Sequence, residues 1–432
     1  MSQLSLAELE ALFDRLWPLP RSITGNGLRD SLKILGEVVP LKLVEVPTGK
    51  EVFDWTIPPE WNVAEAYVVD PKGKKILDFS ENNLHLVGYS IPFEGEMTRQ
   101  ELDAHLYSLS ELPEAIPYVT SYYNKRWGFC LSQKQRDDLP EGKYQVVVRS
   151  SLKEGSLTYG HFILAPESGK SEGEILLSTY LCHPSMANNE LSGPLALASL
   201  YRALKAMPGR RFSYRFVVAP ETIGAIAYLS EHGEAMKRDS RGGFVFTCCG
   251  LKDEFTLKKS KRGDSAADRC AVNILRFSGK GHRVDDFFPT GSDERQFCSP
   301  AFNLPVISIS QGRYMEYPEY HTSLDNKALL SFAAIQGAVN LHLKIIEALE
   351  GNRTYRALHT ECEPQLGKRG LYPTVGNFRE IGDELLRIKY LLFYADGKND
   401  LCHLAEIAKC SVLDLVPLAQ KLEAAGLLAE VK

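Results

Sequence analysis

The sequence predicts an α/β fold with a mainly parallel sheet, a small β-rich domain inserted into it and a winged-helix domain at the C-terminal end. Three observations support this prediction. Apolar strand-like runs alternate with amphipathic helical runs between residues 173 and 351, which is typical of β-α-β units. Residues 48–160 instead contain short β-prone runs broken by Pro, Gly and Asn. Residues 383–426 contain three helical patterns separated by short turns, as in a winged helix.

The length of the chain and these changes in the pattern of strand-like and helical runs predict the domain organisation. A chain of 432 residues exceeds one ordinary core, so two or three domains are expected. We assign residues 1–47 and 161–352 to a discontinuous α/β core. Residues 48–160 form the insertion, and residues 365–432 form the winged-helix domain. A segment rich in Pro and Gly, about 352–375, is predicted to be a linker.

The elements of the core can be read in chain order. Residues 5–17 and about 27–38 have the periodicity of amphipathic helices. The loop between them, LPRSITGNGLR, is rich in turn formers, and residue chemistry alone assigns no role to its Arg21, Ser22 and Thr24. Buried strands are then predicted, with helices between them, at EILLSTYL, RFSYRFVVA, GGFVFTCC and LPVISIS.

The three C-terminal helices are predicted at DELLRIKYLLFYA, LCHLAEIA and VLDLVPLAQKLEAAG, and LLAEVK is a candidate terminal strand. A helix that reads DNA usually presents Arg, Lys, Asn or Gln to bases and phosphates. The candidate recognition helix has one Lys, one Asp and one Glu, and the chain has a net charge of −5. Nucleic acid binding is therefore not favoured, and we expect this domain to dock a protein partner or the chain itself.

Composition limits the cellular setting. Apolar residues make up 44% of the chain and charged residues 24%, as in ordinary globular proteins. The N-terminus lacks the features of a signal peptide, and no apolar stretch is long enough to cross a membrane. The nine cysteines include no C-x-x-C pair, which predicts reduced thiols. We therefore expect a cytoplasmic protein that does not contact membranes.

Four short polar segments each follow an apolar run, and each supplies a chemically useful side chain. The side chains are those of His183, Glu221, Asp293 and His321. In open α/β sheets, sites form beyond the carboxyl ends of the strands, where His183 and Glu221 are predicted to lie. Two imidazoles and a carboxylate suit Zn²⁺ with an open coordination position. Glu221 could then act as general base on a metal-bound water.

Each residue alone also has a structural interpretation. A single His at a strand end is often structural or solvated, and Glu221 could lie in the first turn of a helix. Asp293 and Asp325 could be helix N-caps. The joint pattern of four polar groups, each beyond a core element, favours a site.

Six segments of the sequence resemble those of a known family. The segments LPRSITGNGLR, CHPSMANNELSG, PETIGAIAYL, GDSAADR, GSDERQF and YHTSLD are similar to those of a bacterial aminopeptidase-like family. That family is a divergent relative of the di-zinc aminopeptidases of peptidase clan MH. The resemblance spans essentially the whole chain. It implies an aminopeptidase-like core, an inserted β domain, a C-terminal winged helix and an association with surface-polysaccharide biosynthesis.

The resemblance also implies roles for individual residues. His183 and Asp293 match ligands of the first metal, His321 matches a ligand of the second, and Glu221 matches the general base. The metal-bridging Asp falls on Asn189, and a further carboxylate ligand falls on Thr222.

Asn189 and Thr222 are neutral where the related aminopeptidases have carboxylates, so the site has less negative charge. Two Zn²⁺ ions close together repel strongly. We therefore expect one Zn²⁺ rather than two. His183 and Asp293 would anchor it, completed by Asn189 or water, or joined by His321. Alternatively, Glu190 rather than Asn189 turns inward.

Other candidates carry weaker signals. Arg262 and Arg269, in KRGDSAADR with Asp264, could orient an anionic group of the substrate, although a solvated loop is an equal alternative. Arg313 and Tyr314 could line the pocket, as could Tyr317 and Tyr320, although a structural role is the alternative for each. Cys182 is expected to face the core, because neighbouring residues of a strand point to opposite faces.

These observations predict a metal-dependent hydrolase of a peptide or amide bond, acting on a small peptide or an amide-containing substrate such as a peptide-modified saccharide. The alternative is a catalytically degenerate binding or scaffold protein on the same fold. A third hypothesis is a transcriptional regulator with an enzyme-derived sensor domain.

Overall fold

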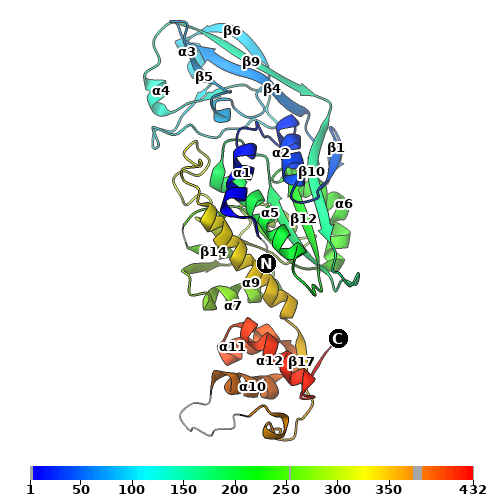
Figure 1. Ribbon diagram of the computed structural model, residues 1–432. Coiled ribbons are helices and arrows are strands. Elements are labelled where there is room, and N and C mark those ends of the chain that lie inside the picture. The colour runs from blue at the N-terminus through cyan, green and yellow to red at the C-terminus, as the bar shows by residue number, and fades with distance from the viewer. Residues whose placement is uncertain (1–2, 253, 373–381, 432) are drawn as a thin grey trace.

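The computed structural model describes residues 3–252, 254–372 and 382–431. Three parts follow one another along the molecule (Figure 1). The β-rich insertion lies at one end, the α/β core in the middle and the winged-helix domain at the other end.

An eight-stranded mixed sheet forms the centre of the core. Its middle four strands are parallel to one another, whereas two strands at one edge and β14 at the other run antiparallel to their inner neighbours. The predicted fold class, α/β with a mainly parallel sheet, is confirmed. In spatial order the strands are β1 (Lys42–Pro47), β10 (Ser156–Leu164), β12 (Ser213–Ala219), β11 (Glu174–Tyr180), β13 (Ser240–Phe246), β16 (Val306–Gln311), β14 (Phe255–Lys258) and β15 (His282–Asp285).

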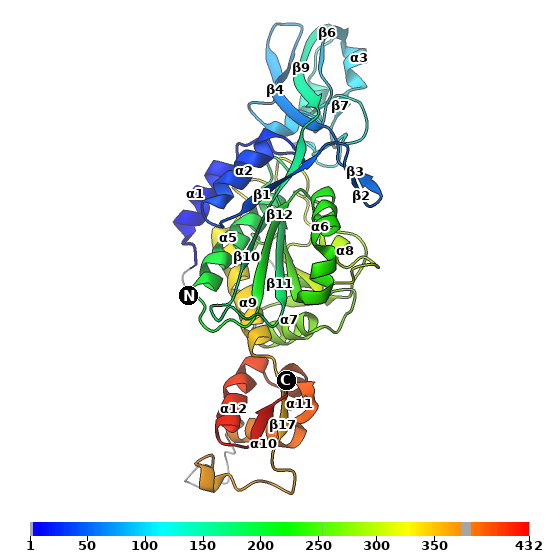
Figure 2. The ribbon, with the colours of Figure 1, turned by 90° about the vertical axis from the view of Figure 1, so that its right-hand side faces the viewer.

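Helices cover both faces of this sheet (Figure 2). Strand β11 shows why: Ile175 and Leu177 point into the apolar cluster on one face, and Leu176 points into the cluster on the other. On the first face lie α1 (Leu6–Leu16), α2 (Asn26–Gly36), α5 (Ser192–Lys205), α7 (Ala266–Phe277) and α9 (Phe332–Gly351). On the second lie α6 (Ile223–Asp239) and α8 (Glu294–Phe297).

The insertion is built on a four-stranded antiparallel sheet. In spatial order its strands are β5 (Lys75–Asp78), β4 (Glu60–Val69), β9 (Lys143–Lys153) and β6 (Phe93–Thr98). Around it lie the strand pairs β2 (Glu51–Val52) with β3 (Trp55–Thr56) and β7 (Leu106–Tyr107) with β8 (Phe129–Cys130), the helices α3 (Arg99–Asp103) and α4 (Gln133–Asp137), and the 3-10 turn η1 (Asn83–His85). Strand β10 begins within the segment predicted as insertion and belongs to the core sheet, where it pairs with β1.

The C-terminal part has three helices and a three-stranded sheet, as a winged helix requires. The helices are α10 (Asp383–Tyr394), α11 (Leu401–Ala408) and α12 (Val412–Ala424), at the three predicted places. The sheet order is β18 (Asp396–Asp400), β17 (Thr354–Ala357) and β19 (Leu428–Glu430). Strand β17 and the 3-10 turn η3 (Gly367–Arg369) lie within the segment predicted as linker, whose residues 373–375 lie outside the described residues.

Among the described residues, no helix combines the length and the apolar character that a membrane crossing requires. All nine cysteines are free thiols, and Cys362 alone is exposed.

Candidate functional site

The four residues singled out by the sequence lie in one neighbourhood at the carboxyl ends of the parallel strands. His183 comes shortly after β11, and Glu221 comes directly after Pro220 at the end of β12. The ring centroids of His183 and His321 are 5.3 Å apart, and Nε2 of His183 is 3.7 Å from Oε2 of Glu221. Asp293 accepts a hydrogen bond of 2.7 Å from the backbone N–H of Thr222, the residue after Glu221.

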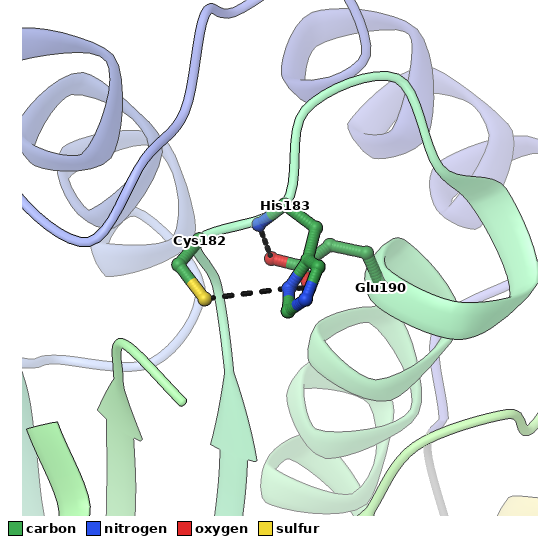
Figure 3. A group of neighbouring side chains, drawn as sticks. All are labelled: Cys182, His183 and Glu190. Atoms are coloured by element: carbon green, nitrogen blue, oxygen red, sulfur yellow. Dashed lines mark hydrogen bonds and ion pairs between the residues drawn. The ribbon is translucent and has the colours of Figure 1, made fainter. Parts of the chain in front are cut away.

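The tightest group at the site is formed by Cys182, His183 and Glu190, whose possible ligand atoms all lie within 4.8 Å of one another (Figure 3). Glu190 accepts the backbone N–H of His183 through Oε1 and approaches its Nδ1 through Oε2, both at 2.9 Å. The Sγ atom of Cys182 is 3.3 Å from the same nitrogen. A carboxylate on Nδ1 fixes the imidazole orientation and leaves Nε2 available on the side of Glu221.

Glu190, rather than Asn189, is the residue that turns toward His183. The turn η2 (Ala187–Leu191) is π-helical, and it presents Glu190 inward just before α5 begins. The side chain of Asn189 contacts the hydroxyl of Tyr180 at 3.3 Å and the sulfur of Met186. This is the alternative arrangement considered from the sequence; the role of Asn189 as a metal ligand stays a prediction.

The buried Asp325 holds this turn in place. Its carboxylate accepts the backbone N–H groups of Asn188 at 2.6 Å and Asn189 at 2.9 Å, and the hydroxyl of Tyr317 at 3.1 Å. The N-cap of the following helix, α9, is Ser331 instead. Asp325 therefore acts across a long sequence separation, and the local capping role considered for it is wrong.

The carboxyl group of Glu221, 23% exposed on the cavity side, acts electrostatically on that of the buried Asp293. Burial raises the pKa of Glu221, while His183 and Arg295 oppose that rise. Burial, and next the negative charge of Glu221, raise the pKa of Asp293 well above its ordinary value. A cation between two such groups would relieve both effects.

His321 provides the second imidazole of the site, with its ring centroid 5.3 Å from that of His183. Burial, and next the proximity of His183, lower the pKa of His321 to about 3, so its imidazole is neutral near pH 7 and can act as a ligand. Its backbone has a φ of 56°, an uncommon conformation for a residue with a side chain.

The insertion holds the loop of His321 in that conformation. The backbone N–H of Tyr118 donates to the carbonyl of His321 at 2.9 Å, and Ile116 and Ser323 exchange two further hydrogen bonds. The ring of Tyr118 also contacts both imidazoles, with centroid distances of 5.0 Å to His183 and 5.3 Å to His321. The insertion is thus part of the site.

A cavity of about 520 Å³ opens beside these residues. The core contributes His183, Glu221, Thr222, Arg295 and His321 to its wall. The insertion contributes an aromatic wall that the sequence did not predict, formed by Trp55, Tyr118, Tyr122 and Tyr123, with Thr120 among them. The hydroxyls of Tyr118 and Tyr122 are hydrogen-bonded at 2.9 Å.

Cys182 belongs to the apolar cluster on the second face of the sheet, as expected, but its Sγ atom also lies 3.3 Å from Nδ1 of His183. Strand β11 ends at Tyr180, so the alternation does not extend to residues 182 and 183, and the thiol also lines the cavity. Burial raises the pKa of the Cys182 thiol to about 11, so it is protonated near pH 7. A protonated thiol is a poor nucleophile.

The weaker candidates lie away from the cavity wall. Arg262 is exposed and donates to the carbonyl of Asn303 at 2.8 Å. Arg269 pairs with Asp400 of the winged-helix domain. Arg313 pairs with Glu316, and Tyr314 donates to the carbonyl of Thr290 at 3.3 Å. The structure does not bring these four side chains to the cavity, and a role in substrate binding stays a prediction.

Arg21, to which the sequence assigned no role, holds the backbone of His183 in place. Its guanidinium donates two hydrogen bonds, of 3.1 and 3.0 Å, to the carbonyl of His183 and a third to the carbonyl of Leu16. The unusual loop LPRSITGNGLR was the available signal, although its partner is far away in the sequence.

Comparison with known proteins identifies the family. A profile described as a domain of unknown function, DUF4910, matches residues 10–352, and a winged helix-turn-helix profile matches residues 353–430. The chain belongs to the DUF4910 family. A relative from Clostridium acetobutylicum, provisionally named a polysaccharide biosynthesis protein with an aminopeptidase-like domain, is 43% identical over 398 residues. That alignment covers 92% of this chain and 90% of the relative.

Solved structures place the core of this DUF4910 member among aminopeptidase-like folds. A crystal structure from Clostridium acetobutylicum, provisionally named a peptidase, matches with a TM-score of 0.91 at 41% identity and covers 99% of this chain and 96% of that one. A zinc aminopeptidase from Bacillus subtilis matches with a TM-score of 0.57 at 12% identity, covering 79% of this chain and 95% of that one. The latter shows a shared fold alone. The predicted aminopeptidase-like family with a winged helix is confirmed.

Proposed function

We propose that this chain is a metal-dependent hydrolase that cleaves a peptide or other amide bond. The observation that carries the proposal is the position of Glu221, whose Oε2 atom lies 3.7 Å from Nε2 of His183 at the wall of the cavity. A carboxylate there can reach a water molecule beside the imidazole. The aminopeptidase-like domain in the name of the relative from Clostridium acetobutylicum supports the same reaction class.

The residues present fit one Zn²⁺. Nε2 of His183, the carboxylate of Asp293 and the neutral imidazole of His321 would hold it, and these are donor types that zinc accepts. Among the described residues these three ligands are not as tightly grouped as Cys182, His183 and Glu190, so binding would draw them closer. When bound, the ion would polarise the scissile carbonyl and lower the pKa of a water molecule.

One ion is favoured over two by the charges of the site. Asn189 and Thr222 are neutral where the family resemblance places carboxylates. Arg295 donates to the Thr222 hydroxyl at 2.5 Å, which adds positive charge at that point. A second cation there would be repelled.

The chain's own residues would perform the remaining steps. Glu221 would take a proton from the attacking water and deliver it to the leaving amine. The hydroxyl groups of Tyr118 and Tyr122 carry one proton each, and the hydrogen bond between them uses one of these protons. The other would remain for the carbonyl oxygen of the substrate, where negative charge develops.

The substrate class includes amide-linked saccharides as well as peptides. The name of the relative from Clostridium acetobutylicum connects it with polysaccharide biosynthesis.

The winged helix would dock a protein partner rather than DNA, since Lys421 pairs with Glu384, and Asp414 of the same helix pairs with Arg387. A DNA mobility-shift assay at low salt tests the regulator hypothesis, and a shift there would favour it.

Metal content and turnover of two variants test the hydrolase. We expect about one zinc per chain in the wild type and in Glu221→Gln, and its loss in His183→Ala. Turnover of a mixture of short peptides and N-acylated amino sugars, followed by mass spectrometry, should fall roughly 10²–10⁴-fold in Glu221→Gln. The exposed Glu234, which pairs with Lys237, provides a matched control as Glu234→Gln. A zinc-free wild type, or turnover unchanged in Glu221→Gln, would contradict the proposal.

The neutral residues Asn189 and Thr222 also favour a second function, a non-catalytic binding or scaffold protein on the same fold. In that case the protein would purify without zinc, and a folded Glu221→Gln variant would retain every cellular phenotype of the wild type.

A further inference from the structure

Arg295 stands out on the wall of the cavity because of its charge. Of the described residues that line the cavity, Arg295 is the one permanent cation and Glu221 is the one acid. The remaining wall is largely aromatic and aliphatic. A positive group in such a wall is strongly attractive to an anion, because the surroundings screen it less than bulk water does.

The guanidinium of Arg295 is held in a fixed orientation. One terminal nitrogen donates to the carbonyl of Gly291, and the other donates to the hydroxyl of Thr222 at 2.5 Å. Thr222 is itself fixed, because its N–H donates to Asp293 and its backbone has a φ of 63°. These two hydrogen bonds use two of the five N–H groups of the guanidinium, so three remain for another acceptor.

The other charges near the cavity have partners of their own. Lys258 and Glu294 form a buried pair at 2.7 Å, and the buried Arg21 faces Glu190. Glu221 and Asp293 are the carboxyl groups whose charges act on Arg295. A Zn²⁺ ion held beside these two carboxylates would attract their negative charge, and the guanidinium of Arg295 would then be available to an anionic group of the substrate.

From the position and fixation of Arg295 we infer that the cavity binds substrates that carry an oxyanion, a carboxylate or phosphate, next to the scissile amide. The free N–H groups of Arg295 bind that oxyanion, and the aromatic wall of the insertion covers the apolar part of the molecule. A guanidinium suits either oxyanion because it can donate two parallel hydrogen bonds. This inference rests on the proposed hydrolase function and narrows its substrate class.

Isothermal titration calorimetry with a matched pair of probes tests the inference. N-acetylalanine carries a carboxylate, and N-acetylalaninamide is its neutral counterpart. Zinc-loaded wild-type protein should bind the acid about tenfold or more tighter, the usual value of a charge-assisted hydrogen bond. Arg295→Met and Arg295→Gln should abolish this preference, and Arg295→Lys should keep part of it. The Gln variant retains an amide that can donate to Gly291 or Thr222, which protects the test against misfolding of the Met variant.

Arg241→Met is the matched control, because Arg241 is an exposed arginine whose guanidinium donates to the carbonyl of Arg238 outside the cavity wall. Inorganic phosphate that displaces N-acetylalanine supports the whole oxyanion class, and phosphate that does not displace it supports the carboxylate alone. An acid preference that persists in the Arg295 variants but disappears with EDTA would assign the anion to the metal and overturn the inference. Equal binding of both probes to the wild type would overturn it as well. Zinc content and turnover, measured separately, report on the hydrolase itself.

Discussion

Arg21 shows how one residue can support a site to which it contributes no ligand. Its side chain is 1% exposed, and it binds the carbonyl of His183 through two nitrogen atoms. Its charge also faces Glu190, the carboxylate that orients the imidazole of His183. Losing Arg21 would therefore leave the buried carbonyl of His183 without its donor and remove the positive charge that faces Glu190.

We expect Arg21→Met to lower the free energy of unfolding by about 1–3 kcal/mol, the usual cost of leaving a buried acceptor unpaired. Zinc content should also fall, because the backbone of His183 is released. Urea denaturation and metal analysis measure the two effects. Arg202→Met is the control, since Arg202 pairs with Glu8 at the surface. If both variants lose the same small amount, Arg21 does not support the site.

Lys258 and Glu294 form a second buried pair next to the site. Their side chains are 4% and 0% exposed, and the ammonium also lies 4.0 Å from the ring centroid of Phe288. Lys258→Met should cost about 3–5 kcal/mol in unfolding free energy, because Glu294 is left charged and buried. The double variant Lys258→Met with Glu294→Gln should recover part of this loss.

Chemical denaturation of both variants checks this expectation. Lys237→Met, which removes one half of an exposed pair with Glu234, should change stability by less than about 1 kcal/mol. A single Lys258 variant as stable as this control would show that Glu294 finds another partner.

At the level of elements, the π-helical turn before α5 decides which residue reaches the site. An ordinary helical turn and a π-helical turn place side chains at different angles, and here Glu190 approaches His183 while Asn189 contacts Tyr180. The sequence shows the helix that follows but not the turn. The turn depends on Asp325, which binds its N–H groups from a distant loop.

The insertion is joined to the core by a cluster of charges. Arg29 on α2 donates to both carboxylate oxygens of Glu60 at the start of β4, at 2.8 and 2.5 Å, and to Glu45 on β1. The hydrogen bonds from Arg29 lower the pKa of Glu60 from 4.5 to about 2. This contribution to stability is therefore complete above about pH 4.5 and is lost as the pH falls toward 2.

Glu60→Gln should reveal that pH dependence. At pH 7 the variant should be less stable than the wild type by about 1–3 kcal/mol, as expected for hydrogen bonds to a charged group. Because an unfolded carboxyl takes up a proton at higher pH than the folded one, the difference should shrink between pH 4.5 and 2. Thermal unfolding over this range measures it. A difference that does not change with pH would mean that Arg29 does not stabilise the ionised form of Glu60.

For the molecule as a whole, the winged-helix domain is firmly attached to the core. The apolar cluster on one face of the core sheet continues into α10, α11 and α12. Asn273 on α7 joins the two parts: it accepts the backbone N–H of Val412 at 2.8 Å and donates to the carbonyl of Cys410 at 3.1 Å. The domain therefore extends the core rather than hanging from a free linker.

Asn273→Ala should loosen this attachment. Removing the amide leaves a buried N–H and a buried carbonyl unpaired, which costs about 1–3 kcal/mol for each group. Hydrogen exchange of residues 401–424 should accelerate, while exchange of the core strands should change little. Arg238→Gln, at a surface pair with Asp239 within the core, is the control. Uniform acceleration throughout the chain would show that Asn273 stabilises the core instead of the attachment.

The sequence by itself determined the fold class, the three C-terminal helices and the four residues around which the site is built. These depend on local patterns: apolar periodicity marks strands and helices, and polar residues after strands reach the same edge of a parallel sheet. The tertiary structure alone decided that Glu190 faces His183, that Arg21 and Asp325 brace the site, and that the insertion supplies its aromatic wall. Each of these depends on contacts between residues that are far apart in the chain, such as Arg21 and His183 with a separation of 162 positions. Such pairs leave no local pattern, because their proximity arises only when the two faces of the sheet and the insertion pack together.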